Sequence, residues 1–399
     1  MPDLPNSLKN LRVAVGHDDL TVPFEGGGKV FSAIAESFPN ADIFTSMANP
    51  ERLTEFSGRK VLTTFMQKIP MKRKLQKALF LLYPLAFESL DLSNYDLVIS
   101  SSARFAHGVV TRPETKHVCY MHSPGRMFWE PESYFSDSPT LGKILTPALS
   151  YLRLWDHTAA QRVDQFIANS KNIAGKIKRY YGRDAEVVYP FVDLERFQAI
   201  GSKVDRQGGS YFRDSEITTE SKRGQYFLVV TRLAPWKRVE IAVGAANEAG
   251  AKLKVVGIGP DEKRLRKMAG PGVEILGGVP DDQLTELYQN CSALIMTQEE
   301  DFGITSLEAQ ACGKPVIAYG AGGALETIVA GPVKAKTLTG QGQTGEFFTP
   351  QAADALAKIL KEFDPKRYRP EDCRANAERF SKERFQRELI KVVERVIEV

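Results

Sequence analysis

Two glutamates with seven residues between them, Glu300 and Glu308, bracket the stretch Phe302-Gly303-Ile304. The apolar run at 293–297 is typical of a buried parallel strand, and residues 305–313 have the spacing of a helix that a glycine ends. The free N–H groups at a helix start favour an anion. Because carboxylates accept hydrogen bonds from sugar hydroxyls, the pattern predicts a site for a diphosphate with a sugar ring on each side. The residues alone leave open that Glu308 is a solvated helix residue and Glu300 a loop charge.

Two cations follow another apolar run in the same half of the chain. Arg232 and Lys237 come after the predicted strand 226–230, and Pro235-Trp236 begins a helix predicted to run through Ala246. Two cations at a strand end and a helix start can hold a diphosphate. An Arg and a Lys in a loop predict nothing by themselves, but they are consistent with the anion site expected near Gly303.

A histidine stands at the end of a third apolar run. His122 ends the predicted strand 116–122, and Pro124-Gly125 breaks the chain directly after it. We expect this side chain at the ligand-binding edge of the sheet, although a structural histidine would have the same pattern. The other four histidines, at positions 17, 107, 117 and 157, have no comparable setting.

A glycine cluster lies between the first predicted strand, 11–16, and a helical pattern that begins at Val30. Gly26, Gly27 and Gly28 let the backbone approach a phosphate or a sugar closely. The cluster is not the GxGxxG fingerprint of dinucleotide-binding folds, and a plain turn would also explain it.

Strand-like runs alternate with helical patterns along most of the chain, which predicts βαβ units with parallel sheets. The other runs predicted as strands lie at 42–46, 95–101, 165–168, 253–258, 273–276 and 315–319. Helices are expected at 352–363 and 371–396. The fold class is therefore α/β.

Length and composition limit the classes of protein to which this chain can belong. A chain of 399 residues suits two domains, and a net charge of +4 gives no case for nucleic acid. The four cysteines are scattered, which favours free buried thiols in a reducing compartment. The first residues lack a signal-peptide pattern, and no apolar run nears the roughly 18 residues of a membrane span. We expect a cytoplasmic protein.

The segment 71–83 combines an apolar stripe with a basic side formed by Lys72, Arg73, Lys74 and Lys77. Such a helix can lie on an anionic membrane surface. An ordinary helix with a solvated basic face is the alternative.

Taken together, these motifs resemble those of the retaining GT-B glycosyltransferases of family 4, also called group 1. The resemblance rests on five features in family order: the glycine loop, His122-Ser123-Pro124 with Phe128-Trp129, the segment Asp156-x5-Arg162-Val163-Asp164, Arg232-x4-Lys237, and Glu300-x7-Glu308. The His122 and Asp156 segments resemble the mannosyltransferase-like branch, where related enzymes that act on lipid-linked acceptors also carry a basic segment near 71–83.

The resemblance implies two Rossmann-like domains that face each other across a central cleft. We expect an acceptor-side domain at 1–195, a linker or insertion at 196–224 and a donor-binding domain at 225–375. A terminal helix at 376–399 would pack back on the first domain.

It also implies the chemistry. The favoured reaction transfers a hexose, expected to be mannose from GDP-mannose, with retention of configuration. The acceptor would be a hydroxyl of a glycolipid or oligosaccharide in the synthesis of cell-surface polysaccharide or glycolipid. Arg232 and Lys237 would neutralise the diphosphate without a metal or other cofactor, and His122 would lie near the reacting sugar. Glu300 would hold the donor sugar, and Glu308 the ribose. The remaining contacts to the donor would come from Gly26, Gly27, Gly28, Gly257, Val279, Phe302, Gly303 and Ile304.

Several alternatives stay open: a UDP-sugar donor, a related enzyme on the same fold, or a non-catalytic sugar-nucleotide sensor. A glycosidase carboxylate pair is disfavoured, since a glycosidase site would not account for the two cations Arg232 and Lys237. The acidic pair Asp18-Asp19 lacks the spacing of a metal-binding DxD triplet.

Overall fold

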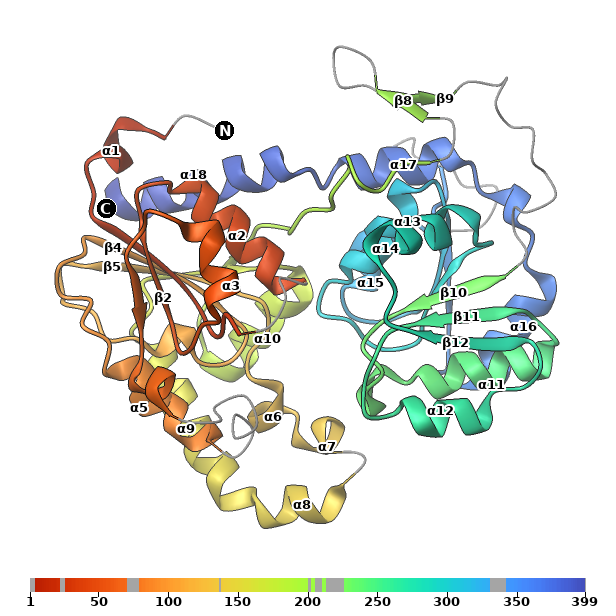
Figure 1. Ribbon diagram of the computed structural model, residues 1–399, viewed down its shortest axis with the longest axis horizontal. Coiled ribbons are helices and arrows are strands. Elements are labelled where there is room, and N and C mark those ends of the chain that lie inside the picture. The colour runs from red at the N-terminus through yellow and green to blue at the C-terminus, as the bar shows by residue number, and fades with distance from the viewer. Residues whose placement is uncertain are drawn as a thin grey trace. The chain divides into compact units, whose positions relative to one another are not determined.

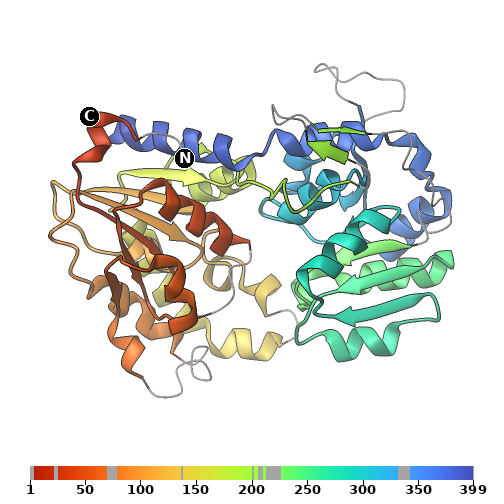
Figure 2. The ribbon, with the colours of Figure 1, turned by 45° about the horizontal axis from the view of Figure 1, so that its top comes forward.

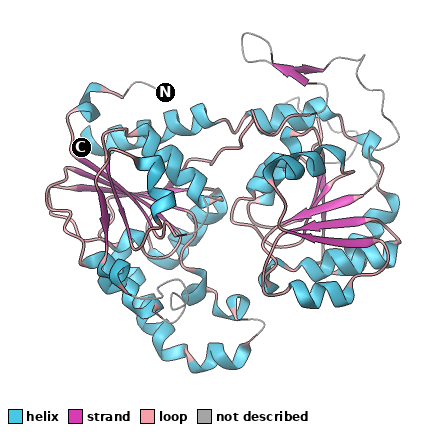
Figure 3. Cartoon of the chain, in the orientation of Figure 1, coloured by secondary structure: helices cyan, strands magenta, loops and turns pink. Residues whose placement is uncertain are grey.

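The computed structural model describes residues 4–21, 26–69, 79–135, 138–199, 202–204, 210–212, 226–330 and 342–398. The chain forms two compact units, the first made of residues 1–190 with 382–399 and the second of residues 191–381. Each unit is a parallel sheet between layers of helices (Figures 1 and 3).

The sheet of the first unit has seven parallel strands in the order β3-β2-β1-β4-β5-β6-β7. They are β1 (Val13–His17), β2 (Asp42–Thr45), β3 (Val61–Thr63), β4 (Leu97–Ser102), β5 (Lys116–Met121), β6 (Gln165–Ala168) and β7 (Ala185–Val187). The order reverses between β1 and β4, because the chain leaves β1 toward β2 and leaves β4 toward β5. Ligands of open α/β sheets bind at the carboxyl ends of strands at such a switch point.

Helices cover both faces of this sheet. On one face, α2 (Gly27–Ser37) and α18 (Lys382–Glu398) pack on each other and on the sheet. On the other lie α5 (Tyr83–Glu88), α9 (Thr146–Ala160) and α10 (Lys171–Tyr181), whose apolar side chains form the core with the strands. The short helices are α1 (Asn6–Lys9), α3 (Pro50–Leu53), α6 (Arg126–Trp129), α7 (Pro131–Tyr134), α8 (Pro139–Ile144) and the 3-10 turns η1 (Thr54–Phe56), η2 (Phe65–Lys68), η3 (Phe80–Leu82) and η4 (Ala106–Gly108).

The sheet of the second unit has six parallel strands in the order β12-β11-β10-β13-β14-β15. They are β10 (Phe227–Val230), β11 (Leu253–Val256), β12 (Val273–Gly277), β13 (Leu294–Met296), β14 (Val316–Tyr319) and β15 (Gly345–Phe348). The order reverses between β10 and β13, so this unit repeats the plan of the first.

On one face of this second sheet, α11 (Val239–Ala249) and α16 (Ala353–Glu362) pack together with α12 (Glu262–Met268). Elsewhere in the unit, α14 (Ile304–Ala311) packs on both α13 (Asp281–Asn290) and α17 (Pro370–Glu378) (Figure 2). The remaining elements are α15 (Ala324–Thr327), the 3-10 turns η6 (Pro235–Lys237) and η7 (Pro365–Arg367), and an antiparallel hairpin of β8 (Ser202–Val204) and β9 (Ser210–Phe212).

Two helices differ from the sequence prediction. The helix expected from Pro235 through Ala246 is a 3-10 turn followed by α11, because Arg238 has a left-handed backbone with φ 53° that interrupts the α-helix. The helix expected at 371–396 is two helices, α17 and α18, separated by residues 379–381.

The borders of the units lie close to those expected from the sequence. The first unit ends at Pro190 rather than residue 195, and the returning segment begins at Lys382 rather than residue 376. The hairpin of β8 and β9 lies within the stretch expected to be a linker. The basic residues Lys72, Arg73, Lys74 and Lys77 lie outside the described residues.

Candidate functional sites in the two units

His122 lies directly after β5, at the carboxyl edge of the first sheet. Its backbone N–H donates to the carbonyl of Ser102 at 2.8 Å, which continues the ladder by one residue. Its ring atom Nε2 lies 2.7 Å from the hydroxyl of Ser101 at the end of β4. The expected position at the carboxyl edge of the sheet is confirmed, and contact of His122 with a ligand stays a prediction.

The glycine cluster lies against this ring. Gly26 precedes α2 with φ 49°, and Gly27 and Gly28 form the first turn of that helix rather than a loop before it. A Cβ atom placed on Gly27 would lie 3.3 Å from Cε1 of His122, closer than ordinary contact. A side chain at position 27 would therefore press on the His122 ring, so the glycine keeps the approach between α2 and His122 close.

His17 corrects a sequence interpretation, because it does share the setting of His122. It ends β1 and pairs with Ser101 across the switch point. Its Nδ1 lies 2.9 Å from the carbonyl oxygen of Ser101 and 3.2 Å from the hydroxyl, and its ring centroid is 6.0 Å from that of His122. Burial lowers the pKa of His17, which favours the neutral ring.

The neighbouring acidic residues have structural partners. The Asp18 carboxylate accepts backbone N–H bonds of 2.7 Å each from Ala103, Phe105 and Ala106, which shape the turn after β4. Asp19 accepts from the backbone N–H of Thr21 at 2.7 Å.

Asp156, the first residue of the motif shared with Arg162-Val163-Asp164, is buried in the first unit. One carboxylate oxygen accepts from Trp129 Nε1 at 2.6 Å and from the Tyr181 hydroxyl at 2.7 Å, and the other lies 3.2 Å from His107 Nε2. These partners join α6, α9, α10 and η4, which accords with a role in packing.

In the second unit, Lys237 and Glu300 meet at the switch point. Lys237 Nζ donates to Glu300 Oε1 at 2.7 Å, with the two side chains only 17% and 14% exposed. The Gln298 amide donates to the same oxygen. Because Lys237 follows β10 and Glu300 follows β13, residues 63 positions apart form one polar cluster.

Arg232 extends the positive charge of this region. It is exposed, and its guanidinium carbon lies 5.9 Å from the centroid of the Trp236 ring, within the range of a cation–π contact. The structure thus places the Arg232 guanidinium against an aromatic face.

The start of α14 lies beside Glu300. Gly303 has φ 92°, and a Cβ there would lie 2.8 Å from Met296 Cε and 3.6 Å from Glu300 Cβ. No side chain caps the helix start. Phe302 is buried against Phe380, whereas Ile304 is half-buried on the first turn. The predicted strand–turn–helix is confirmed, with the helix beginning at Ile304 rather than Thr305.

A second glycine turn, at Gly322 and Gly323, packs against the loop that carries Glu300. The N–H of Gly323 donates to the Glu300 carbonyl at 2.7 Å, and Gly322 forms a parallel bridge with Glu300. A Cβ on Gly323 would lie 2.3 Å from the Cα of Phe302. Only glycine allows the two backbones to approach this closely.

Glu308 is half-buried on α14 and is oriented by a residue that the sequence analysis did not single out. The hydroxyl of Tyr288 on α13 donates to Glu308 Oε2 at 2.8 Å. Burial raises the pKa of Tyr288 well above its usual value, and the nearby carboxylate raises it further, so this hydroxyl stays a donor. Glu308 is therefore not a freely solvated helix residue.

Gly257 and Val279 follow β11 and β12 at the same edge of the second sheet. The N–H of Gly257 donates to the carbonyl of Gly277 at 2.8 Å, and Val279 is half-buried two residues later. Their contact with a nucleotide base stays a prediction, as does the expectation that the two units contribute to one cleft.

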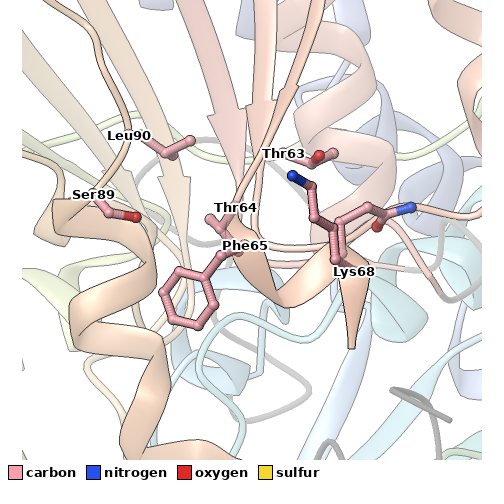
Figure 4. A pocket seen from close by; sticks show the side chains of 7 residues that line it. Thr63, Thr64, Phe65, Lys68, Ser89 and Leu90 are labelled. Carbon is pink, nitrogen blue, oxygen red and sulfur yellow. The ribbon is translucent and has the colours of Figure 1, made fainter. Parts of the chain in front are cut away.

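A polar pocket of about 310 Å³ lies elsewhere in the first unit, at the carboxyl end of β3 (Figure 4). Its lining includes Thr63, Phe65, Lys68 and Ser89 but none of the residues singled out from the sequence. We therefore do not assign it to the candidate sites.

Sequence reasoning singled out His122, Lys237, Glu300 and Glu308 as candidates but missed the residues that contact them, namely His17, Ser101, Tyr288 and Gln298. The serine run 100–102 at a strand end is a signal that could have indicated Ser101. Tyr288 has only ordinary helical spacing in the sequence, so no local pattern distinguishes it.

Two parallel sheets, each with polar groups at its switch point, define a protein of two Rossmann-like units. Residues 26–196 match the family model "Glycosyltransferase Family 4", and residues 211–380 match "Glycosyl transferases group 1". The chain belongs to these group 1 glycosyltransferases and has their GT-B fold.

Relatives and solved structures agree with this family. The chain is 28% identical over 242 residues to D-inositol 3-phosphate glycosyltransferase 2 of Catenulispora acidiphila, and 35% identical over 185 residues to a D-inositol 3-phosphate glycosyltransferase of Streptomyces bingchenggensis. These matches cover 53% and 40% of the chain and span only 54% and 38% of the relatives' own lengths.

Among solved structures, Anabaena HepE in complex with UDP and glucose aligns with a TM-score of 0.66 at 18% identity. Sucrose-phosphate synthase from Thermosynechococcus elongatus aligns with a TM-score of 0.68 at 16% identity. Both alignments cover 96% of this chain and 99% of the other. At such low identity they support the fold alone. None of the described helices has the length and apolar character needed to cross a bilayer.

Proposed function

We propose that the protein is a retaining glycosyltransferase that moves a hexose from a nucleotide diphospho-sugar to an acceptor hydroxyl. The observation that carries this proposal is the Lys237–Glu300 pair, 2.7 Å apart, beside the uncapped start of α14. A cation, a hydroxyl-accepting carboxylate and free helix N–H groups suit a sugar diphosphate better than they suit any neutral ligand.

In this proposal the second unit binds the donor. Lys237, Arg232 and the α14 start neutralise the diphosphate, and charge that develops on the leaving group strengthens these contacts in the transition state. No metal ion is required for that role. The Glu300 carboxylate accepts hydrogen bonds from the hexose hydroxyls, and Glu308, held by Tyr288, accepts them from the ribose.

The transfer itself exchanges one bond for another at the anomeric carbon. The bond from that carbon to the β-phosphate oxygen breaks as the acceptor oxygen forms a bond on the same face. The acceptor proton passes to the departing phosphate oxygen, so no protein nucleophile is needed. His122 and the glycines of α2 contact the sugar and the acceptor from the first unit.

For the donor we propose GDP-mannose, which the likeness of His122-Ser123-Pro124 and Phe128-Trp129 to the mannosyltransferase-like branch supports. A UDP-hexose is the second candidate, because the similarly folded HepE was solved with UDP-glucose. For the acceptor we propose a glycolipid or oligosaccharide in polysaccharide or glycolipid synthesis at the membrane surface. Inositol 3-phosphate is the second candidate, from the names of the relatives.

A donor screen tests the proposal. The purified chain is incubated with GDP-mannose, UDP-glucose and ADP-glucose, with and without lipid-linked saccharides or inositol 3-phosphate. Nucleoside diphosphate release and binding are both measured, and proton NMR of the product gives its anomeric configuration. We expect one donor to turn over with retention, and Glu300→Gln to slow that turnover strongly.

Donor binding without turnover of any sugar would leave a sugar-nucleotide sensor instead. An inverted product would contradict same-face transfer. Lys361→Ala serves as the control, because Lys361 is an exposed residue of α16 paired with Glu248 and should leave turnover unchanged.

A further inference from the structure

Three consecutive serines at the end of β4 each contact a histidine. The pairs are Ser100 Oγ with His117 Nε2 at 2.8 Å, Ser101 Oγ with His122 Nε2 at 2.7 Å, and Ser102 Oγ with His107 Nδ1 at 3.0 Å. Successive side chains of a strand point to opposite faces. Ser100 and Ser102 therefore face the buried core with Asp156, and Ser101 alone faces α2 and the candidate site.

The hydrogen bonds around Ser101 have a defined direction. A carbonyl oxygen can only accept, so the 2.9 Å contact of His17 Nδ1 with the Ser101 carbonyl requires a proton on that nitrogen. The same N–H points toward the Ser101 hydroxyl oxygen at 3.2 Å. The Ser101 hydroxyl oxygen therefore accepts a hydrogen bond from His17. The hydroxyl hydrogen of Ser101 is then directed to His122 Nε2, 2.7 Å away.

His17 is itself held in place. Its ring stacks on Phe31 of α2 with centroids 5.1 Å apart, and Phe31 is fully buried. Burial lowers the pKa of His17, which favours the neutral ring, and the Ser101 carbonyl keeps the ring proton on Nδ1. The orientation of the Ser101 hydroxyl is therefore set by groups that have little freedom to move.

We propose that Ser101, oriented by His17, is a positioning residue that holds the neutral form of the His122 ring in the tautomer with the proton on Nδ1. His122 then offers an N–H donor to an oxygen of the bound sugar or phosphate, and its Nε2 lone pair is occupied by Ser101. Gly27 leaves room for this ring, since a Cβ there would lie 3.4 Å from Nδ1. The role in transfer rests on the proposed function, whereas the tautomer does not.

Nitrogen NMR tests the tautomer without any substrate. The chain has only five histidines, so a two-bond ¹H–¹⁵N spectrum of ¹⁵N-histidine-labelled protein at pH 7.5 is simple, and His122→Asn identifies the signal of His122. We expect the Nδ1–H pattern for His122 in the wild type. In Ser101→Ala we expect conversion toward the Nε2–H form that an unconstrained histidine side chain favours.

The matched control is Ser100→Ala, which removes the equivalent hydroxyl on the opposite face of the same strand. It should change the signal of His117 and leave that of His122 as it was. An Nε2–H pattern for His122 in the wild type would overturn the proposal, and so would a signal that Ser101→Ala does not alter.

Kinetics then test the role in transfer. We expect Ser101→Ala to lower kcat about tenfold with less than a twofold change in donor KM, and Ser101→Thr, which keeps the hydroxyl, to restore much of the loss. A tautomer that changes in Ser101→Ala while kcat stays at the wild-type value would refute the positioning role. If the wild type transfers no sugar at all, the proposed function fails, and the NMR result still decides the tautomer.

Discussion

Lys237 and Glu300 form an ion pair of 2.7 Å between the two strand ends that flank the switch point of the second sheet. Both side chains are largely shielded from solvent, and Gln298 donates to the same carboxylate oxygen that accepts from Lys237. Both hydrogen bonds are to Oε1 of Glu300, and neither involves Oε2. A pair held in this way has its cation and its acceptor in position before a ligand arrives, which reduces the reorganisation needed during reaction.

Removal of the lysine charge should therefore slow the chemical step. In Lys237→Ala we expect kcat to fall by about 100-fold, on the order of 2.7 kcal/mol, because charge develops on the diphosphate as the sugar departs. Steady-state kinetics on the donor identified by the screen measure this. Lys361→Ala is the control, and wild-type kcat in Lys237→Ala would remove this residue from the mechanism.

Loss of the Tyr288 hydroxyl should weaken binding of the nucleotide as a whole. In Tyr288→Phe we expect donor and free nucleoside diphosphate to bind roughly five- to tenfold more weakly, about the net contribution of one hydrogen bond. Glu308→Ala should weaken both by more. Calorimetric titration compares the two ligands.

Tyr226→Phe is the matched control, since the Tyr226 hydroxyl donates to the Leu287 carbonyl at 3.0 Å rather than to Glu308. If Glu308→Ala binds the free nucleotide as tightly as the wild type, Glu308 does not hold the ribose.

The close contact between the backbones of Gly323 and Phe302 should leave no room for a side chain at position 323. In Gly323→Ala the Cβ would lie 2.3 Å from the Cα of Phe302, so the loop that carries Glu300 must shift. We expect a loss of 1–3 kcal/mol in the free energy of unfolding, about the cost of overpacking, together with weaker donor binding. Urea denaturation measures the stability.

Gly175→Ala serves as a control, because it should raise the free energy of unfolding rather than lower it. Gly175 lies exposed within α10, and a Cβ there meets nothing within 4 Å. This change should stabilise the protein by about 0.5–1 kcal/mol, because alanine favours a helix interior over glycine. A Gly323→Ala protein as stable as the wild type would contradict the close approach.

The buried His117 should make stability depend on pH in mild acid. Burial lowers its pKa to about 3 in the folded state, whereas the unfolded chain titrates near 6.5. Below pH 6.5 the unfolded state binds the extra proton, so this residue reduces the free energy of unfolding by up to about 1.4 kcal/mol per pH unit until pH 3. Above pH 6.5 the effect vanishes.

Urea denaturation of His117→Gln between pH 7 and pH 4 checks this contribution. The glutamine amide can replace Nε2 as a partner of Ser100 but does not titrate. We expect a shallower loss of stability with falling pH than in the wild type. Equal slopes for the two proteins would show that His117 is not the group responsible.

Chelation of metal ions should leave the reaction intact. The proposal assigns neutralisation of the diphosphate to Lys237, Arg232 and the start of α14, so turnover with excess EDTA is expected to stay within twofold of the untreated rate. The assay compares EDTA with EDTA plus excess Mg²⁺. A rate that collapses with EDTA and returns with Mg²⁺ would reassign that role to a metal ion.

The sequence by itself determined the class of fold and the residue types at the strand ends. Parallel strands buried on both faces require continuous apolar runs, and helices between them require period-3.6 patterns, so β5, β10, β13 and α14 could be read locally. The same local patterns placed His122, Lys237, Glu300 and Glu308 at the carboxyl edge of a sheet.

The tertiary structure decided which side chains act on those residues. His17 meets Ser101 only because β1 and β4, more than 80 residues apart, are neighbours in the sheet, and Tyr288 meets Glu308 only because α13 packs on α14. Such partners leave no trace in local periodicity, since strand order and helix packing depend on the burial of the whole unit. Arg238 likewise interrupts a helix that its neighbours favour, because the chain must turn from the end of β10 into α11.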